Sequence, residues 1–173
     1  MEHSTRKLGA TFTWLGWIIG FFILVLLFQQ ILDHQNNPNQ SVKTVTGDGY
    51  SEITLERNRQ GHYVLDGEIN HQKVTFLIDT GATTTSIPES VSNKLGLRKG
   101  APFYVDTANG TTTAYITKLE SLRLGLIEFN DVLASINPGF GGDEILLGMN
   151  ILKNLELVQR GNTLIIRTPD GQI

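Results

Sequence analysis

The chain begins with a long uncharged run, in contrast to the short apolar stretches that follow it. From Phe12 to Phe28 the sequence FTWLGWIIGFFILVLLF carries no charge, and apolar character continues through Ile31 and Leu32. Roughly 20 such residues cross the hydrocarbon core of a bilayer as a helix. The run therefore predicts a transmembrane helix over residues 12–32. A cleaved signal peptide is the main alternative, but the next residues, QQILDHQNN, contain no small-x-small cleavage site and favour a retained anchor.

The charges that flank this run predict its orientation. Arg6 and Lys7 precede it, whereas Asp33 and His34 follow it. Cytoplasmic segments next to a span carry the excess of Lys and Arg. We therefore expect a single-pass protein of the inner (cytoplasmic) membrane, with residues 1–11 in the cytoplasm and the rest on the periplasmic or extracytoplasmic side. Residues 33–48, DHQNNPNQSVKTVTGD, are polar and lack periodicity, which predicts a linker.

After the linker, short apolar stretches alternate with Gly and Asn turns, the pattern of a domain built from strands. Pro88–Leu95 predicts a helix, because proline suits the first turn and Gly96 ends it. A second short helical pattern follows Gly148. We expect an all-β domain over residues 49–173 with one or two short helices and with strands at Ser51–Arg57, His62–Ile69, Lys73–Ile78, Phe103–Asp106, Thr112–Leu124, Ile127–Ile136, Glu144–Leu147, Leu155–Gln159 and Thr163–Arg167.

Composition narrows the function classes. Among 173 residues, 40% are hydrophobic and 18% are charged, which is a globular balance rather than a disordered one. The net charge of −3 provides no basic field for a nucleic-acid partner. The absence of cysteine excludes a disulfide framework, a CxxC redox site and a thiolate zinc site.

The stretch FLIDTGATTTSIP, from Phe76 to Pro88, places Asp79 directly after an apolar strand. An Asp-Thr-Gly sequence by itself is compatible with an ordinary turn. Two further features favour a functional role for the Asp79 carboxylate. The residues after Gly81 are small or carry hydroxyls that can hydrogen-bond carboxylates or backbone. Downstream, Ile145–Leu152 (ILLGMNIL) is an apolar strand that runs into Gly148 and a short helical pattern.

Together these motifs resemble the retropepsin-like (clan AA) aspartic proteases, and in particular the single-domain, membrane-anchored versions found in bacteria. The family pattern is two hydrophobic residues, Asp-Thr/Ser-Gly-Ala, a flap hairpin, and then two hydrophobic residues and a glycine that opens a helix. The matching positions here are Leu77-Ile78-Asp79-Thr80-Gly81-Ala82, the hairpin around Ala108-Asn109-Gly110, and Leu146-Leu147-Gly148 followed by Asn150. The resemblance covers about Gly61 to Arg167 and implies a retropepsin-like closed β-barrel or sandwich.

The resemblance also implies a mechanism. Two carboxylates that share a proton activate water and protonate the leaving amine, and aspartic proteases are the standard example of such a pair. The sequence holds one Asp-Thr-Gly, so the resemblance implies a homodimer in which each chain contributes Asp79. Thr80 would brace the pair across the chains, Gly81 would allow the two loops to approach, and Ala82 and Thr83 would support the loop. No metal or organic cofactor is implied.

The flap would be the hairpin Tyr104–Tyr115, which closes over the substrate and excludes water. Its tip would consist of Ala108, Asn109 and Gly110, and an ordinary β-hairpin is the alternative. At the second motif, Leu147, Gly148 and Asn150 would pack against the Asp79 loop.

Other polar residues are interpreted more simply. Asp106 and Asp143 are not followed by Thr/Ser-Gly and are expected to be solvated loop acids. His62 and His71 flank a hairpin, but no third ligand converges on them, so no metal site is expected. Asn137–Gly142 lacks the Gly-Lys-Ser/Thr of a phosphate loop and is expected to be a surface loop beside the site.

The sequence therefore predicts a membrane-anchored aspartic endopeptidase that hydrolyses polypeptides as a homodimer. The alternative from another class is a catalytically silent module that keeps the same fold and serves as a tethered binding or assembly partner. Retention of Asp79 together with Thr80 favours the enzyme.

Overall fold

The computed structural model describes residues 2–47, 49–107 and 110–168. It divides into two compact units, Met1–Gln35 and Asn36–Ile173. The first unit belongs to α1 (Glu2–Asn36), and this confirms the apolar helix expected near the N-terminus. Its segment Trp14–Asn36 contains an 18-residue window with a mean hydropathy of 2.3 and, within the part of the chain that is described, is the one helix long and apolar enough to cross a membrane.

The second unit is the β-domain, and its elements follow the expected order closely. It contains the short helices α2 (Glu89–Lys94) and α3 (Met149–Leu152). Asn70 and His71 both have positive φ, 49° and 62°, as the two central residues of a tight hairpin turn require. The strands are β1 (Thr44–Gly47), β2 (Tyr50–Glu56), β3 (Val64–Ile69), β4 (Gln72–Ile78), β5 (Ser86–Pro88), β6 (Pro102–Thr107), β7 (Gly110–Leu124), β8 (Ile127–Asn137), β9 (Glu144–Leu147), β10 (Glu156–Arg160) and β11 (Thr163–Arg167).

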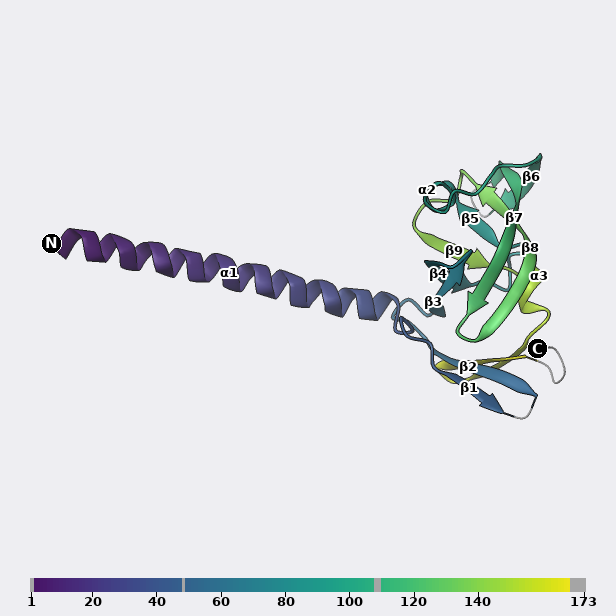
Figure 1. The fold of residues 1–173 in the computed structure, drawn as a ribbon, viewed down its shortest axis with the longest axis horizontal. Helices are drawn as coiled ribbons and strands as arrows, with labels where there is room; N and C mark the ends of the chain where they lie inside the picture. The colour runs from purple at the N-terminus through teal and green to yellow at the C-terminus, as the bar shows by residue number, and fades with distance from the viewer. Residues whose placement is uncertain (1, 48, 108–109, 169–173) are drawn as a thin grey trace. The chain divides into compact units, whose positions relative to one another are not determined.

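Seven of these strands form one sheet, in which six close into a barrel and β6 extends beyond β7, as expected for an all-β domain with a closed barrel (Figure 1). Their order is β3-β4-β9-β5-β8-β7-β6, and an additional pairing between β3 and β7 closes the sheet. Gly67 makes this closure possible, because a Cβ at this position would lie 2.5 Å from the carbonyl oxygen of Arg123 on β7. The strand β9 enters between β4 and β5, pairing parallel with β4 and antiparallel with β5. This insertion brings the two sequence motifs together.

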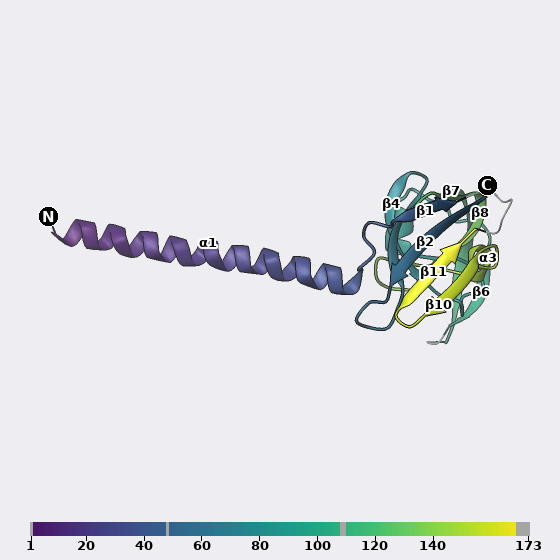
Figure 2. The same ribbon diagram turned by 90° about the horizontal axis from the view of Figure 1, so that it is seen from below.

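A second sheet, in the order β1-β2-β11-β10, lies at the end of the barrel opposite β6 (Figures 1 and 2). Residues 33–48, expected to be an irregular linker, therefore include a strand, because β1 (Thr44–Gly47) lies within them. The side chain of Asn39 also bonds the backbone of Glu56 and Val64. A polar segment without periodicity can thus be ordered by backbone pairing and amide side chains rather than by apolar burial.

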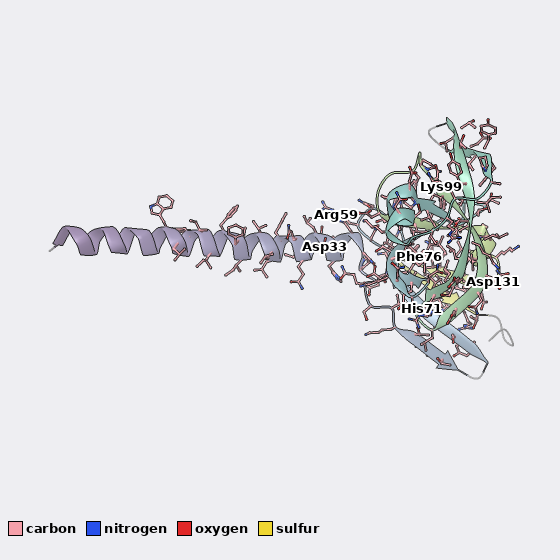
Figure 3. The ribbon with its side chains drawn as sticks, turned by 45° about the horizontal axis from the view of Figure 1, so that its top comes forward. Asp33, Arg59, His71, Phe76, Lys99 and Asp131 are labelled. Carbon is pink, nitrogen blue, oxygen red and sulfur yellow. The ribbon has the colours of Figure 1, made fainter. Side chains whose placement is uncertain are left out.

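One continuous apolar core joins the barrel to the second sheet. Phe76 of β4 is fully buried in it, as are Ile53 of β2 and Ile166 of β11, whereas His71, Lys99 and Asp131 are exposed (Phe76 and these three are labelled in Figure 3). Side chains of β4 therefore anchor the strand that leads to Asp79.

Candidate active site

Asp79 stands at the end of β4, held by the neighbouring strand β9. Ile78 pairs with Leu147, and the Asp79 N–H donates to the carbonyl oxygen of Leu147 at 3.1 Å. The loop then folds back on the carboxylate, since the Gly81 N–H donates to Asp79 Oδ1 at 2.9 Å. The Asp79 side chain is half-buried, whereas Thr80 and Gly81 are exposed. The backbone thus positions the acid while leaving the tip of the loop at the surface.

Gly148 packs directly against this loop. A Cβ at Gly148 would lie 2.6 Å from the carbonyl carbon of Thr84, so no side chain fits without moving the backbone. The two residues after it continue the contact. The Met149 N–H donates to Ala82 O at 2.8 Å, and the Asn150 N–H donates to Thr83 O at 3.0 Å. The first two residues of α3 are therefore hydrogen-bonded to the Asp79 loop, and Gly148 before them packs against it.

The side chain of Asn150 ties a third segment to these two. Its Oδ1 accepts hydrogen bonds from Thr85 N at 2.8 Å and from Thr85 Oγ1 at 3.0 Å. Its Nδ2 donates to the carbonyl oxygen of Leu133 on β8 at 2.9 Å. Thr85 is completely buried, and its hydroxyl also accepts from the Gly148 N–H at 3.4 Å. The polar groups of this buried junction thus satisfy one another.

The predicted flap is an antiparallel hairpin of β6 and β7. The register runs from Pro102 opposite Tyr115 to Thr107 opposite Gly110. Ala108 and Asn109, two of the three expected tip residues, lie outside the described residues. Of the acids on this hairpin, Asp106 accepts a hydrogen bond from the Thr111 hydroxyl at 2.7 Å.

A cleft of about 750 Å³ opens between the Asp79 loop and this hairpin. Apolar side chains and neutral hydroxyl or amide side chains make up most of its wall, and the charged residues among its lining are both acids. A cleft with an acid at its base and a hairpin at its edge can hold an extended peptide. The lining consists of Asp79, Gly81, Ala82, Thr83, Thr84, Ser86, Phe103, Tyr104, Val105, Asp106, Ser135, Asn137, Gly139, Phe140 and Leu146.

The expected site residues divide between this cleft and its support. Asp79, Gly81, Ala82 and Thr83 line the cleft, whereas Leu147, Gly148 and Asn150 lie behind the loop as described above. Sequence reasoning missed Ser86, Ser135 and Leu146 as lining residues. Alternation along a strand signals which side chains face the interior, but it does not reveal which strand ends meet at one cleft.

The other acids considered from the sequence, Asp143 and Asp106, lie in different surroundings from Asp79. Asp143 forms an ion pair with Lys94 at 3.1 Å and does not line the cleft. Asp106 does line the cleft, through the flap strand rather than through a loop like that of Asp79. Across residues 2–47, 49–107 and 110–168, no group of three or more His, Asp or Glu residues could hold a metal ion.

Comparison with known proteins identifies the family. The model of the family described as "gag-polyprotein putative aspartyl protease" matches residues 65–154, a segment that includes the Asp79 loop, the flap strands and Gly148. The chain belongs to this aspartyl protease family, and its fold is that of the retropepsin-like proteases.

Individual relatives agree with this assignment. A solved structure titled as a retropepsin-like aspartic protease from Rickettsia conorii is 28% identical, with a TM-score of 0.58, and the match covers 74% of this chain and 96% of that one. An uncharacterized protein of Rickettsia prowazekii (strain Madrid E) is 31% identical over 109 residues, 61% of this chain and 46% of that protein. An uncharacterized protein of Sinorhizobium sp., from the cobV 5' region, is 26% identical over 125 residues, 70% of this chain and 54% of that protein. The chain thus spans about half the length of these two curated relatives.

Proposed function

We propose that this chain is a membrane-anchored aspartic endopeptidase that hydrolyses peptide bonds as a homodimer. One observation carries the proposal: the Asp-Thr-Gly loop places Asp79 at the base of a cleft of about 750 Å³, in a chain that belongs to an aspartyl protease family. A silent binding module has no chemical need for an acid held at this position by Leu147 and Gly81.

The proposed reaction needs a second carboxylate next to Asp79. In the pair, one carboxylate takes a proton from water as the water oxygen attacks the peptide carbonyl carbon. The other carboxyl group donates its proton, and the C–N bond breaks as the leaving amine is protonated. A symmetric dimer supplies the second group as Asp79 of the partner chain, on a two-fold axis. The pair then titrates as a unit rather than as two separate acids.

The other residues of the site receive roles that fit this arrangement. Thr80, exposed at the tip of the loop, braces the pair across the two chains, and Gly81 allows the loops to approach closely. Ala82 and Thr83 form the cleft wall beside the acid. The flap of β6 and β7, with Gly110 at the start of β7, closes over the bound peptide and excludes water. Leu147, Gly148 and Asn150 hold the loop from behind. The chemistry requires no metal or organic cofactor.

We further propose that residues 12–32 of α1 anchor the chain in the cytoplasmic membrane as a single span. Residues 1–11 then lie in the cytoplasm, and the excess of positive charge before the span sends the β-domain to the periplasmic or extracytoplasmic side. The compact β-domain begins at Asn36, within the segment expected to be a linker and before residue 49, where the domain was expected to start. Asn37 and Asn39 are buried in this domain.

The proposal is tested by cleavage of a mixed peptide library by the full chain in detergent, near pH 5 and at high protein concentration. Asp79→Asn is expected to abolish cleavage while leaving the fold intact, because it preserves size and removes the ionisable group. Asp143→Asn is the matched control, since this acid is exposed and outside the cleft. Equal cleavage by Asp79→Asn and wild type would refute the role of Asp79.

The dimer is tested by mixing the two chains. Equal amounts of wild type and Asp79→Asn, allowed to exchange partners, are expected to lower activity to about one quarter, because only dimers with two intact acids react. Independent monomers would retain about one half. A dimer that cleaves nothing in the library supports the alternative of a silent binding or assembly module.

A further inference from the structure

A loop that contains two arginines is hydrogen-bonded to Asn36, the first residue of the β-domain. This arginine loop, residues 57–62 (RNRQGH), joins β2 to β3. Asn58 organises it: its Oδ1 accepts from Gln60 N at 3.0 Å and from His62 N at 2.9 Å. The Asn58 side chain is buried, whereas Arg57 and Arg59 are exposed. The loop therefore has a backbone held by hydrogen bonds and two exposed arginines, of which Arg59 is labelled in Figure 3.

A second turn adds to the same surface. The Arg57 N–H donates to the carbonyl oxygen of Asn162 at 2.9 Å, which places the turn after β10 beside the arginine loop. Arg160, exposed at the end of β10, belongs to this turn. Arg57, Arg59, Gly61 and Asn162 are among the residues that line an open hollow of about 340 Å³. Arginine binds phosphate oxygens through its planar fork of N–H donors. Glu56, which directly precedes Arg57 in the sequence, is the acid next to this loop.

The arginine loop is bonded to the residue at which the membrane helix ends. Asn58 Nδ2 donates to the carbonyl oxygen of Asn36 at 2.9 Å. Asn36 is the last residue of α1 and the first residue of the β-domain. The hydrogen bond to Asn36 therefore keeps the arginine loop near this residue, whatever the angle between the helix and the domain. A helix rises about 1.5 Å per residue, so Asn36 is no more than about 6 Å beyond Leu32, within the depth of a lipid headgroup layer.

We propose that the arginine loop and Arg160 bind the phosphate groups of anionic lipids beside the anchor. The protein as a whole has a net charge of −3 and is not drawn to an anionic surface by its overall field. Attraction must come from cations held near the headgroups, where each arginine strengthens binding about fivefold. The contact restricts the orientation of the β-domain on the membrane. This inference rests on the proposed membrane anchor and not on the proposed proteolysis.

The experiment uses the full chain in nanodiscs and a single label. The chain has no cysteine, so Gln60→Cys provides a unique site for a fluorophore on the arginine loop. Quenching by nitroxide-headgroup lipid is compared in phosphatidylcholine alone and in phosphatidylcholine with about one third phosphatidylglycerol. The test variant adds Arg59→Gln and Arg160→Gln. The matched control adds Arg98→Gln and Lys153→Gln, two exposed cations elsewhere on the domain, so that both variants lose the same charge.

Anionic lipid is expected to increase quenching of the wild type and of the control. The test variant is expected to lower the ratio of bound to unbound loop by about 25-fold, and salt near 0.5 M is expected to remove the lipid dependence. Quenching that does not depend on phosphatidylglycerol, or that is the same in the test variant and the wild type, would overturn the proposal. A chain that does not enter nanodiscs would overturn it as well, by removing the anchor. Cleavage of a soluble peptide by the same samples reports separately on Asp79, and the test variant is expected to leave it unchanged.

Discussion

Replacement of Asn150 by alanine tests whether the junction behind the Asp79 loop holds the site together. The side chain of Asn150 makes three hydrogen bonds, two with Thr85 and one with Leu133 O. Alanine removes all three and leaves the Thr85 N–H, which is fully buried, without this acceptor. Because Thr85 is fully buried, we expect no water to take the place of the lost amide oxygen. The variant should therefore fold with a weakened connection between α3 and the Asp79 loop.

The magnitude follows from the groups left behind. A typical hydrogen bond contributes about 1 kcal/mol net, and a buried donor or acceptor left unsatisfied costs about 1–3 kcal/mol. For Asn150→Ala the loss of unfolding free energy is therefore about 3 kcal/mol. At about 3 °C per kcal/mol for a domain of this size, the midpoint of thermal unfolding should fall by about 10 °C.

Differential scanning calorimetry of the full chain in detergent measures this shift. Asn154→Ala is the matched control, because Asn154 is exposed, lies just beyond the end of α3, and its side chain donates one hydrogen bond, to the carbonyl oxygen of Asn150. The control should change the midpoint little. If Asn150→Ala unfolds within about 2 °C of the wild type, the junction does not hold the loop and the reasoning fails.

Two further substitutions separate support of the loop from chemistry. Gly148→Ala forces a Cβ to within 2.6 Å of the Thr84 carbonyl carbon, so it should destabilise the domain by about 1–3 kcal/mol and also lower peptide cleavage. Unchanged calorimetry and activity would contradict that close packing. Asp106→Asn should keep peptide cleavage within about threefold of wild type, because this acid bonds Thr111 on the flap and is not part of the proposed pair. Loss of cleavage comparable to that of Asp79→Asn would instead make Asp106 the second catalytic acid.

Much of the fold could be predicted because apolar periodicity and turn residues agree along the chain. Gly96 ends α2 as expected, with its N–H bonded to Asn93 O at 3.2 Å. The strand Glu144–Leu147 has the expected bounds. Strongly apolar strands between glycine or asparagine turns give such signals, since both burial and backbone conformation favour the same boundaries.

Two strands were not expected from the sequence, for different physical reasons. β1 is formed by Thr44–Gly47, which offers little apolar surface and is stabilised by its pairing with β2. β5 is the three residues Ser86–Pro88, too short for a periodic pattern, and it lies between β8 and β9. Tertiary pairing determines both strands, and local sequence contains little record of it.

The site shows the same division. The two motifs that carry it could be recognised from sequence, because Asp79 and Gly148 each have a local pattern around them. Their contact could not, because it depends on β9 entering the barrel between β4 and β5. Ser135 lines the cleft for a similar reason: its N–H donates to Thr85 O at 2.9 Å, across a pairing between distant strands.

The pattern of hydrogen bonds around the loop also bears on how the proposed dimer would form. Within one chain, Leu147, Met149 and Asn150 bond the Asp79 loop from behind, so its backbone is fixed before any second chain arrives. Thr80 remains exposed at the tip. A loop that is held on one side and open on the other brings little conformational entropy loss to an association, and preorganisation of this kind strengthens binding without new contacts. It follows that weakening the junction at Asn150 should loosen the proposed dimer as well as destabilise the domain, and the loss of activity in Asn150→Ala should be partly recovered at high protein concentration.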